Sequence, residues 1–217
     1  MNNLNTVYQR LSNEPYEPRG IIHSEIALVL HLAHVLHIET IIESGRARGQ
    51  STYILGKYLP WVDVHSIELR TSLPDEEFAK ERLANLKNVK LYEDDGSILI
   101  PTLARMMPRR TAILMDGPKG EAAVKVLEQC FKLPHVWVGF IHDMRKLDNG
   151  EPSPHRAIAA ERLPNHKFTD DPAYVAGTSW MDARVAEAGG PVGPQFEAVH
   201  GSYGPTIGAF FNPQNEI

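Results

Sequence analysis

The chain has 217 residues, of which 42% are hydrophobic and 23% are charged, a composition typical of one globular α/β domain. A net charge of −5 and an isoelectric point near 6.1 exclude a strongly basic protein, so we expect neither nucleic acid nor a membrane as partner. The single cysteine, Cys130, excludes an internal disulfide and a cysteine-based zinc cluster, and without a membrane-spanning run or a signal-peptide pattern we expect a cytoplasmic protein.

The N-terminal segment divides into a polar arm and a helix. Residues 1–20 are polar and contain Pro15 and Pro18, which indicates a loosely held arm or a short cap. From Ile21 to His37 apolar residues recur every three or four positions, which predicts an amphipathic helix. The apolar side of this helix also offers a surface for a homodimer.

The next stretch predicts a strand, a glycine turn and a helix. An apolar run at 38–42 ends in Glu43, the turn contains Gly45 and Gly49, and a helix is expected over 50–59. Glycine tolerates positive φ and has no Cβ, so the backbone N–H groups of such a turn can approach a ligand. The competing explanation for the two glycines is that a strand-to-helix turn needs them for its geometry alone. A dinucleotide fingerprint would need glycines at 45, 47 and 50, but positions 47 and 50 are Ala47 and Gln50.

Two further strands end on acidic residues. The strand expected over 62–68 ends at Glu68, roughly twenty residues after the glycine turn begins, where a βαβ nucleotide site places its ribose-binding carboxylate. The strand expected over 88–92 leads to Asp95, Gly96 and Ser97, which are candidates for contact with an adenine edge. A solvated acid at 68 and a helix cap at 95 are the alternatives.

The fourth and fifth strands carry the candidate catalytic residues. The apolar run 111–116 ends at Asp116 and is followed closely by Lys119, whereas the run 136–141 ends at His142 and Asp143. Two carboxylates at the ends of neighbouring strands suit Mg²⁺, whose preferred ligands are oxygens. Helix capping and direct substrate binding are the alternatives. If strand alternation continues, the side chain of His142 points away from the two aspartates.

The order E-x-G-x-x-x-G-x-S resembles the cofactor loop of class I S-adenosylmethionine (SAM) dependent methyltransferases. The D-x-x-K motif makes residues 21–145 most similar to the small metal-dependent O-methyltransferases of the catechol and caffeoyl-CoA type. The resemblance implies a Rossmann-like, mostly parallel seven-stranded sheet with helices on both faces. It implies that the cofactor contacts are Glu43, Gly45, Ala47, Gly49, Ser51, Glu68, Asp95, Gly96, Ser97 and Asp116.

The same resemblance assigns roles to the strand-end residues. It makes Asp116 and Asp143 metal ligands, with Mg²⁺ as the expected ion, and Lys119 the general base. Met144 stands where the family usually has an asparagine ligand, so the expected coordination is short by one group. His142 joins the catalytic candidates as a further acid–base group.

We expect one domain, comprising an arm and helix (1–37), a SAM-binding core (38–143), an insertion that serves as a lid (144–195) and a terminal antiparallel hairpin (196–217). The two strands of the hairpin are expected over 196–200 and 207–211. Tyr174 and Trp180 are candidate walls for the substrate, or members of the core. The expected function is SAM-dependent methyl transfer to a hydroxyl of a small-molecule acceptor. A SAM-binding regulatory protein and a nicotinamide-dependent oxidoreductase are the alternatives.

Overall fold

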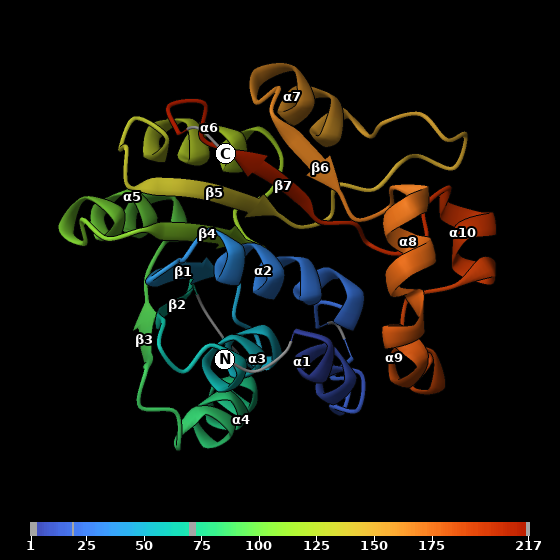
Figure 1. Cartoon of the computed structure of the whole chain (residues 1–217), viewed down its shortest axis with the longest axis horizontal. Coiled ribbons are helices and arrows are strands. Elements are labelled where there is room, and N and C mark those ends of the chain that lie inside the picture. Colours follow the sequence, from blue (N-terminus) through green and yellow to red (C-terminus); the bar gives the residue numbers. More distant parts are fainter. Residues whose placement is uncertain (1–3, 19, 70–72, 216–217) are drawn as a thin grey trace.

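The computed structural model of the chain describes residues 4–18, 20–69 and 73–215. Within these residues the backbone forms one seven-stranded sheet in the order β3-β2-β1-β4-β5-β7-β6 (Figure 1). The strands are β1 (Thr40–Ser44), β2 (Asp63–Glu68), β3 (Val89–Glu93), β4 (Thr111–Met115), β5 (Val136–Ile141), β6 (His166–Phe168) and β7 (Gly208–Phe211). The pairs among β1 to β5 are parallel, and β7 runs antiparallel to both β5 and β6. The predicted fold class is confirmed.

Helices cover both faces of the sheet (Figure 1). They are α1 (Leu4–Leu11), α2 (His23–Val35), α3 (Gln50–Tyr58), α4 (Leu73–Leu83), α5 (Gly96–Met106), α6 (Glu121–Cys130), α7 (Pro154–Arg162), α8 (Pro172–Thr178), the 3₁₀ helix η1 (Ser179–Asp182), α9 (Ala183–Glu187) and α10 (Pro194–His200). Alternate residues of a strand point to opposite faces, so Ile41 and Leu114 pack with α1, α2 and α3, whereas Ile42 and Ile113 pack with α5, α6 and α7. This double burial explains why the central strands are nearly continuous apolar runs.

The order of the strands places a site at one edge of the sheet. The chain moves outward from β1 to β3 on one side and from β4 to β5 on the other, so the connections after β1 and β4 leave in opposite directions. Open α/β sheets bind ligands at the carboxyl ends of the strands beside such a switch point. The glycine turn after β1 and the D-x-x-K segment after β4 both lie there.

The prediction of a terminal hairpin is only half correct. Gly208–Phe211 forms the expected strand, but residues 196–200, which we predicted to be its partner strand, belong to helix α10. Pro194 begins this helix at a position where its missing N–H costs nothing, and Gly201 ends it with a φ of +63°. The strand that pairs with β7 is instead His166–Phe168, from the segment predicted to be a lid.

Two other segments take part in the body of the fold. The polar arm contains helix α1, which is anchored by the fully buried Leu11. The segment 144–195 supplies β6 to the sheet and α7 to its cover, whereas the role of this segment as a lid stays a prediction. Trp180 is exposed, and the half-buried Tyr174 donates a hydrogen bond to the carbonyl oxygen of Ser24 at 2.7 Å.

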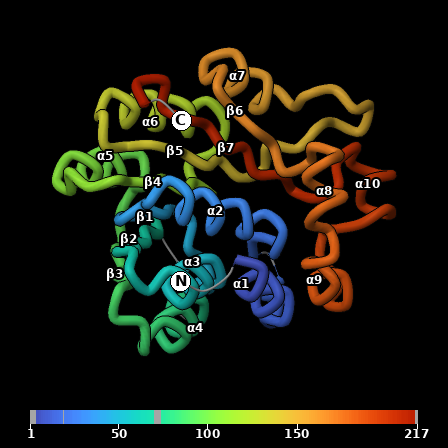
Figure 2. Tube along the Cα trace, viewed as in Figure 1, coloured from blue at the N-terminus to red at the C-terminus, as the bar shows by residue number. Residues whose placement is uncertain are grey.

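The segment that contains η1 packs against the N-terminal helices, so regions far apart in the sequence lie side by side (Figure 2). The carboxylate of Asp182 accepts a hydrogen bond from the backbone N–H of Ser24, at the start of α2, at 2.9 Å. Burial raises the pKa of Asp182 to about 6, against the effect of that hydrogen bond. The nearby Glu25 carboxylate acts in the same direction as burial.

Asp182→Asn should stabilise the protein at pH 8 by about 1–3 kcal/mol and change its stability little at pH 4. The folded state binds the Asp182 proton more tightly than the unfolded state, so this group lowers stability as pH rises from about 4 to 6. Urea unfolding of both proteins at the two pH values measures the effect, with the exposed Asp94→Asn as the control. An equal gain at both pH values would contradict the prediction.

Candidate functional site

The glycine turn after β1 has the backbone conformation that its sequence suggests. Gly45, Ala47 and Gly49 have φ values of +91°, +43° and +77°. A Cβ at Gly45 would lie 2.9 Å from both the carbonyl carbon and the Cβ of Asp116, so only glycine fits between the ends of β1 and β4. Ala47 adopts the left-handed region in spite of its side chain.

The carboxylate of Glu43 lies beneath this turn and braces it. Its oxygens accept hydrogen bonds from the hydroxyls of Ser51, Thr52 and Ser66, the last at 2.8 Å, and the residue is only 1% exposed. Burial raises the pKa of Glu43, while the three hydroxyl donors favour the charged form. Glu43 therefore holds the loop to α3 and β2, and the predicted contact of its side chain with a cofactor has no support in this geometry.

A cavity of about 230 Å³ lies directly beside the turn. Of the predicted cofactor residues, those that line it are Gly45, Ala47, Ser51 and Asp116. The wall across the cavity comes from the arm that precedes α2, through Glu17 and Ile21. Gln50, at the start of α3, binds this arm by accepting the Glu17 N–H at 2.5 Å, so the arm closes one side of the predicted cofactor site.

The predicted nucleoside contacts lie outside the lining of this cavity. The carboxylate of Glu68 accepts the backbone N–H of Ala47 at 2.7 Å, which joins the end of β2 to the glycine turn. Asp95 is the N-cap of α5 and accepts the N–H of Ser97 at 2.8 Å, so the capping explanation is confirmed for this residue. Gly96 has no room for a Cβ, which would lie 2.8 Å from the Cβ of Ser44.

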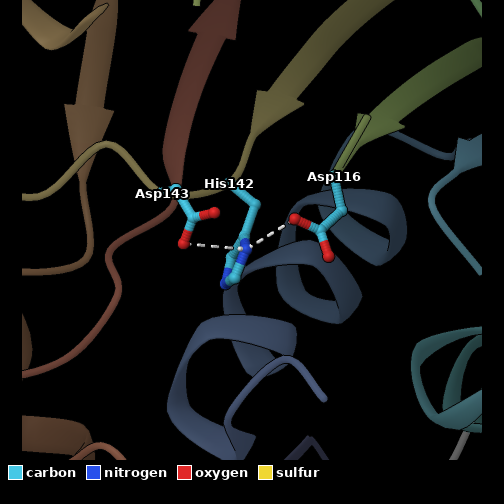
Figure 3. Close-up of side chains that lie close together, drawn as sticks. All are labelled: Asp116, His142 and Asp143. Carbon is cyan, nitrogen blue, oxygen red and sulfur yellow. Dashed lines mark hydrogen bonds and ion pairs between the residues drawn. The ribbon is translucent and has the colours of Figure 1, made fainter. Parts of the chain in front are cut away.

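Asp116, His142 and Asp143 come together at the carboxyl ends of β4 and β5 (Figure 3). The imidazole Nδ1 of His142 lies 2.8 Å from Asp116 Oδ1 and 3.4 Å from Asp143 Oδ1. The prediction that His142 points away from the aspartates is wrong. Because Met115 pairs with Ile141, the next residues of both strands, Asp116 and His142, share one face. Asp143 has a φ of +61°, so the alternation of the strand does not continue through it.

The ammonium group of Lys119 contacts both aspartates, with Asp143 Oδ2 at 2.5 Å. Burial lowers the pKa of Lys119, but the charges of Asp116 and Asp143 outweigh it and leave the pKa above its ordinary value. A general base must be unprotonated, so these contacts oppose the predicted base role of Lys119. They favour a role as a fixed positive charge.

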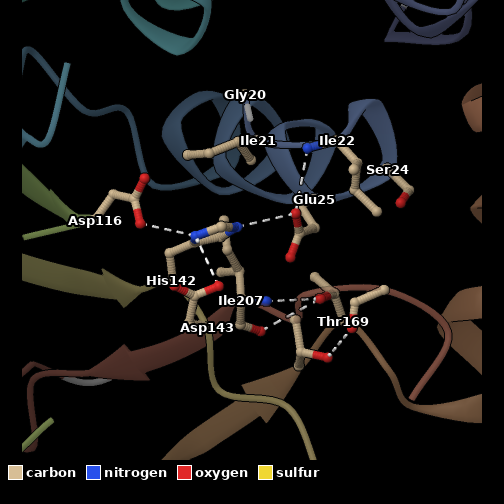
Figure 4. Close-up of polar contacts among 12 residues, drawn as sticks. Gly20, Ile21, Ile22, Ser24, Glu25, Asp116, His142, Asp143, Thr169 and Ile207 are labelled. Carbon is tan, nitrogen blue, oxygen red and sulfur yellow. Dashed lines mark hydrogen bonds and ion pairs between the residues drawn. The ribbon is translucent and has the colours of Figure 1, made fainter. Parts of the chain in front are cut away.

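Glu25, on helix α2, is a member of the site that the sequence interpretation missed (Figure 4). Its Oε2 lies 3.3 Å from the Nε2 of His142, and the residue is 1% exposed. Burial opposes the charged imidazole, but Glu25 and Asp116 together raise the pKa of His142 to about 10. A glutamate directly before the apolar run 26–30 of this helix was the available signal, because a buried carboxylate is almost always paired.

The donor set suits a divalent cation. One ligand atom each from Asp116, His142 and Asp143 can be chosen so that all three lie within 4.8 Å of one another. Met144 is 1% exposed and packs in the core beside α6 and α7, so it is no ligand. The side chains therefore fit a metal ion, with the imidazole as a third donor.

A larger cavity, of about 980 Å³, lies at the opposite edge of the sheet between α1, α2 and the end of α3. It is lined by residues such as Leu30 and Trp61, and Asp116, His142 and Asp143 are not among its lining residues. Among the described residues no helix is both long enough and apolar enough to cross a membrane.

Solved methyltransferase structures share this fold. The O-methyltransferase from Bacillus cereus in complex with SAH is 15% identical to the chain at a TM-score of 0.59, covering 96% of this chain and 90% of that one. The O-methyltransferase TomG from Streptomyces achromogenes, involved in tomaymycin synthesis and in complex with SAM, is 19% identical at a TM-score of 0.54, covering 96% and 89%. No protein-family model and no curated protein matches the chain. At these identities the likeness establishes the class I methyltransferase fold.

Proposed function

We propose that the protein transfers a methyl group from SAM to a hydroxyl of a small-molecule acceptor. The observation that carries this proposal is the double position of Asp116, which lines the cavity beside the glycine turn and also bonds to His142 and Lys119. Asp116, Lys119, His142 and Asp143 together form a charged cluster. A methyl donor held by the turn and an acceptor held by this charged cluster would therefore meet at Asp116. Holding two reactants in contact is the main source of rate in such a transfer.

SAM would bind in the cavity beside the glycine turn. It carries the methyl group to be transferred on its positively charged sulfonium sulfur. The turn after β1 and Ser51, in the first turn of α3, line this cavity. Glu68 has two carboxylate oxygens, which suit the two hydroxyls of a ribose. Its present contact with the N–H of Ala47 keeps this carboxylate beside the turn.

The charged cluster would act on the acceptor. Asp143 is the more exposed of the two aspartates, with 52% of its side chain accessible, so it is the group placed to receive a hydroxyl proton. Lys119 and His142 supply positive charge that stabilises the oxygen as that proton leaves. If a cation is held by Asp116, His142 and Asp143, the imidazole would ligate it in the neutral form, and the ion would replace the imidazolium charge with Lewis-acid stabilisation at the same oxygen.

Calorimetric titration with SAM, and separately with NAD, tests the proposal. We expect micromolar binding of SAM in preference to NAD, and Glu68→Ala should weaken SAM binding about 10- to 100-fold because two hydrogen bonds to a charged group are lost. Glu93→Ala is the matched control, because Glu93 ends the neighbouring strand and is exposed. Preferential NAD binding would contradict the proposal, and SAM binding without product on any hydroxyl acceptor would favour a regulatory protein.

A further inference from the structure

We propose that His142 completes a site for a divalent transition-metal ion such as Mn²⁺ or Co²⁺, together with Asp116 and Asp143, and that Glu25 orients the imidazole. The ion-binding site itself depends on these four side chains alone. Its part in methyl transfer rests on the function proposed above.

The two nitrogens of the imidazole face different partners (Figure 4). Nδ1 faces the oxygens of Asp116 and Asp143, at 2.8 and 3.4 Å, whereas Nε2 faces Glu25 Oε2 at 3.3 Å. Histidine ligands in metalloproteins commonly bind the ion through one nitrogen and a carboxylate through the other. His142 has this arrangement, with Nδ1 as the nitrogen on the ligand side.

Glu25 can orient the imidazole of His142 because its own carboxylate is held in place within the folded core. Glu25 lies on α2, 117 residues before His142, and its Oε2 also accepts the backbone N–H of Ile22 at 3.2 Å. This second bond limits the rotation of the carboxylate. His142 is 7% exposed, so its ring has little freedom to leave the site.

The imidazole replaces a ligand that the sequence lacks. The side chain of Met144 is buried in the core, on the side of the sheet that α6 and α7 cover. The pairing of Met115 with Ile141 brings His142 beside Asp116 instead. Three protein donors are thereby restored, and one of them is nitrogen.

A nitrogen donor changes which ion the site prefers. Sites made of carboxylate, carbonyl and water oxygens suit Mg²⁺, whereas imidazole binds first-row transition metals better. The ligand set of Asp116, His142 and Asp143 should therefore select Mn²⁺ or Co²⁺ over Mg²⁺.

The charges around the site also call for a cation. Glu25, Asp116 and Asp143 contribute three negative charges, and Lys119 contributes one positive charge at Asp116 and Asp143. While the imidazole is protonated this sum is −1. Ligation of an ion through Nδ1 requires release of the Nδ1 proton, after which the sum is −2 and one divalent ion makes it zero. The side chain of Lys119 is 43% exposed, so its ammonium group has a path to solvent when an ion enters.

Calorimetric titration of the metal-free full-length protein with Mn²⁺, Co²⁺ and Mg²⁺ tests this site, with the visible absorption of Co²⁺ as a second readout. We expect one site that binds Mn²⁺ and Co²⁺ at least about tenfold more tightly than Mg²⁺. Glu25→Gln should weaken Mn²⁺ binding about 10- to 100-fold, as loss of a carboxylate behind a ligating histidine does. His142→Asn should remove the preference for Mn²⁺ over Mg²⁺.

His37→Asn is the matched histidine control, because His37 lies before β1, at the opposite edge of the sheet, and its φ of +52° suits asparagine. Its metal binding should equal that of the unchanged protein. Circular dichroism establishes that each variant is folded. Lys119→Met removes the competing ammonium group, so it should bind Mn²⁺ more tightly.

Absence of binding in both the unchanged protein and Lys119→Met would overturn the metal site. So would Mg²⁺ binding as tight as Mn²⁺ binding, with both unaffected in His142→Asn, since the imidazole would then be no ligand. The SAM titration separates the two proposals. SAM binding without metal binding overturns this inference alone, whereas metal binding without SAM binding overturns the proposed function.

Discussion

Gly45→Ala is expected to abolish SAM binding and to destabilise the protein by about 2–5 kcal/mol. At φ +91° an alanine is strained by about 1–3 kcal/mol, and its Cβ would lie 2.9 Å from two atoms of Asp116, which adds a similar cost. Relief of the clash must move the turn away from the end of β4. That movement would alter the cavity in which the ligand is proposed to bind.

Urea unfolding and calorimetric titration with SAM measure the two effects. Gly177→Ala is the control, because Gly177 lies in helix α8 with no atom within 4 Å of an added Cβ. Alanine there should leave SAM binding unchanged and stabilise the helix by about 0.5–1 kcal/mol. Normal stability and normal SAM affinity in Gly45→Ala would show that the turn tolerates a side chain.

His142→Leu should destabilise the metal-free protein by about 3–5 kcal/mol, because it leaves the carboxylate of Glu25 buried without a positive partner. Glu25→Gln in the same chain removes that charge. The double variant Glu25→Gln/His142→Leu should therefore recover much of the loss, and urea unfolding of the four proteins gives the coupling between the two residues.

The exposed ion pair of Arg109 and Asp63 supplies the control for this cycle. The side chains of this pair are 59% and 45% exposed, so Arg109→Leu should cost no more than about 1 kcal/mol. A loss of that small size in His142→Leu would mean that Glu25 does not depend on His142. In that case the proposed orientation of the imidazole would also lose its support.

The parallel half of the fold was predictable because its elements have strong local signals. The runs at 111–116 and 136–141 are apolar, as strands buried on both faces must be, and they form β4 and β5. The segment 196–200 was misassigned because five residues bounded by turn signals can be strand or helix. The partner of β7 comes from residues 166–168, about 40 residues earlier, and nothing local to either segment specifies that pairing.

The candidate site shows the same division. The glycine turn, Glu68 and Asp116 could be predicted because a strand end, a turn and a helix start are local features of the chain. The orientation of His142 was predicted incorrectly, since it depends on the register between β4 and β5 and on the positive φ of Asp143.

From its residue order alone, the chain specifies a class I methyltransferase type of sheet and the strand ends at which a ligand would bind. Tertiary structure alone decides that Glu25, His142 and Asp116 meet, because their contact requires the first turn of α2 to lie at the carboxyl ends of β4 and β5. Glu25 and His142, which are 117 positions apart in the sequence, are then in direct electrostatic contact. Local preferences act over a few residues, whereas the register of strands and the packing of a helix are set by burial across the whole sheet.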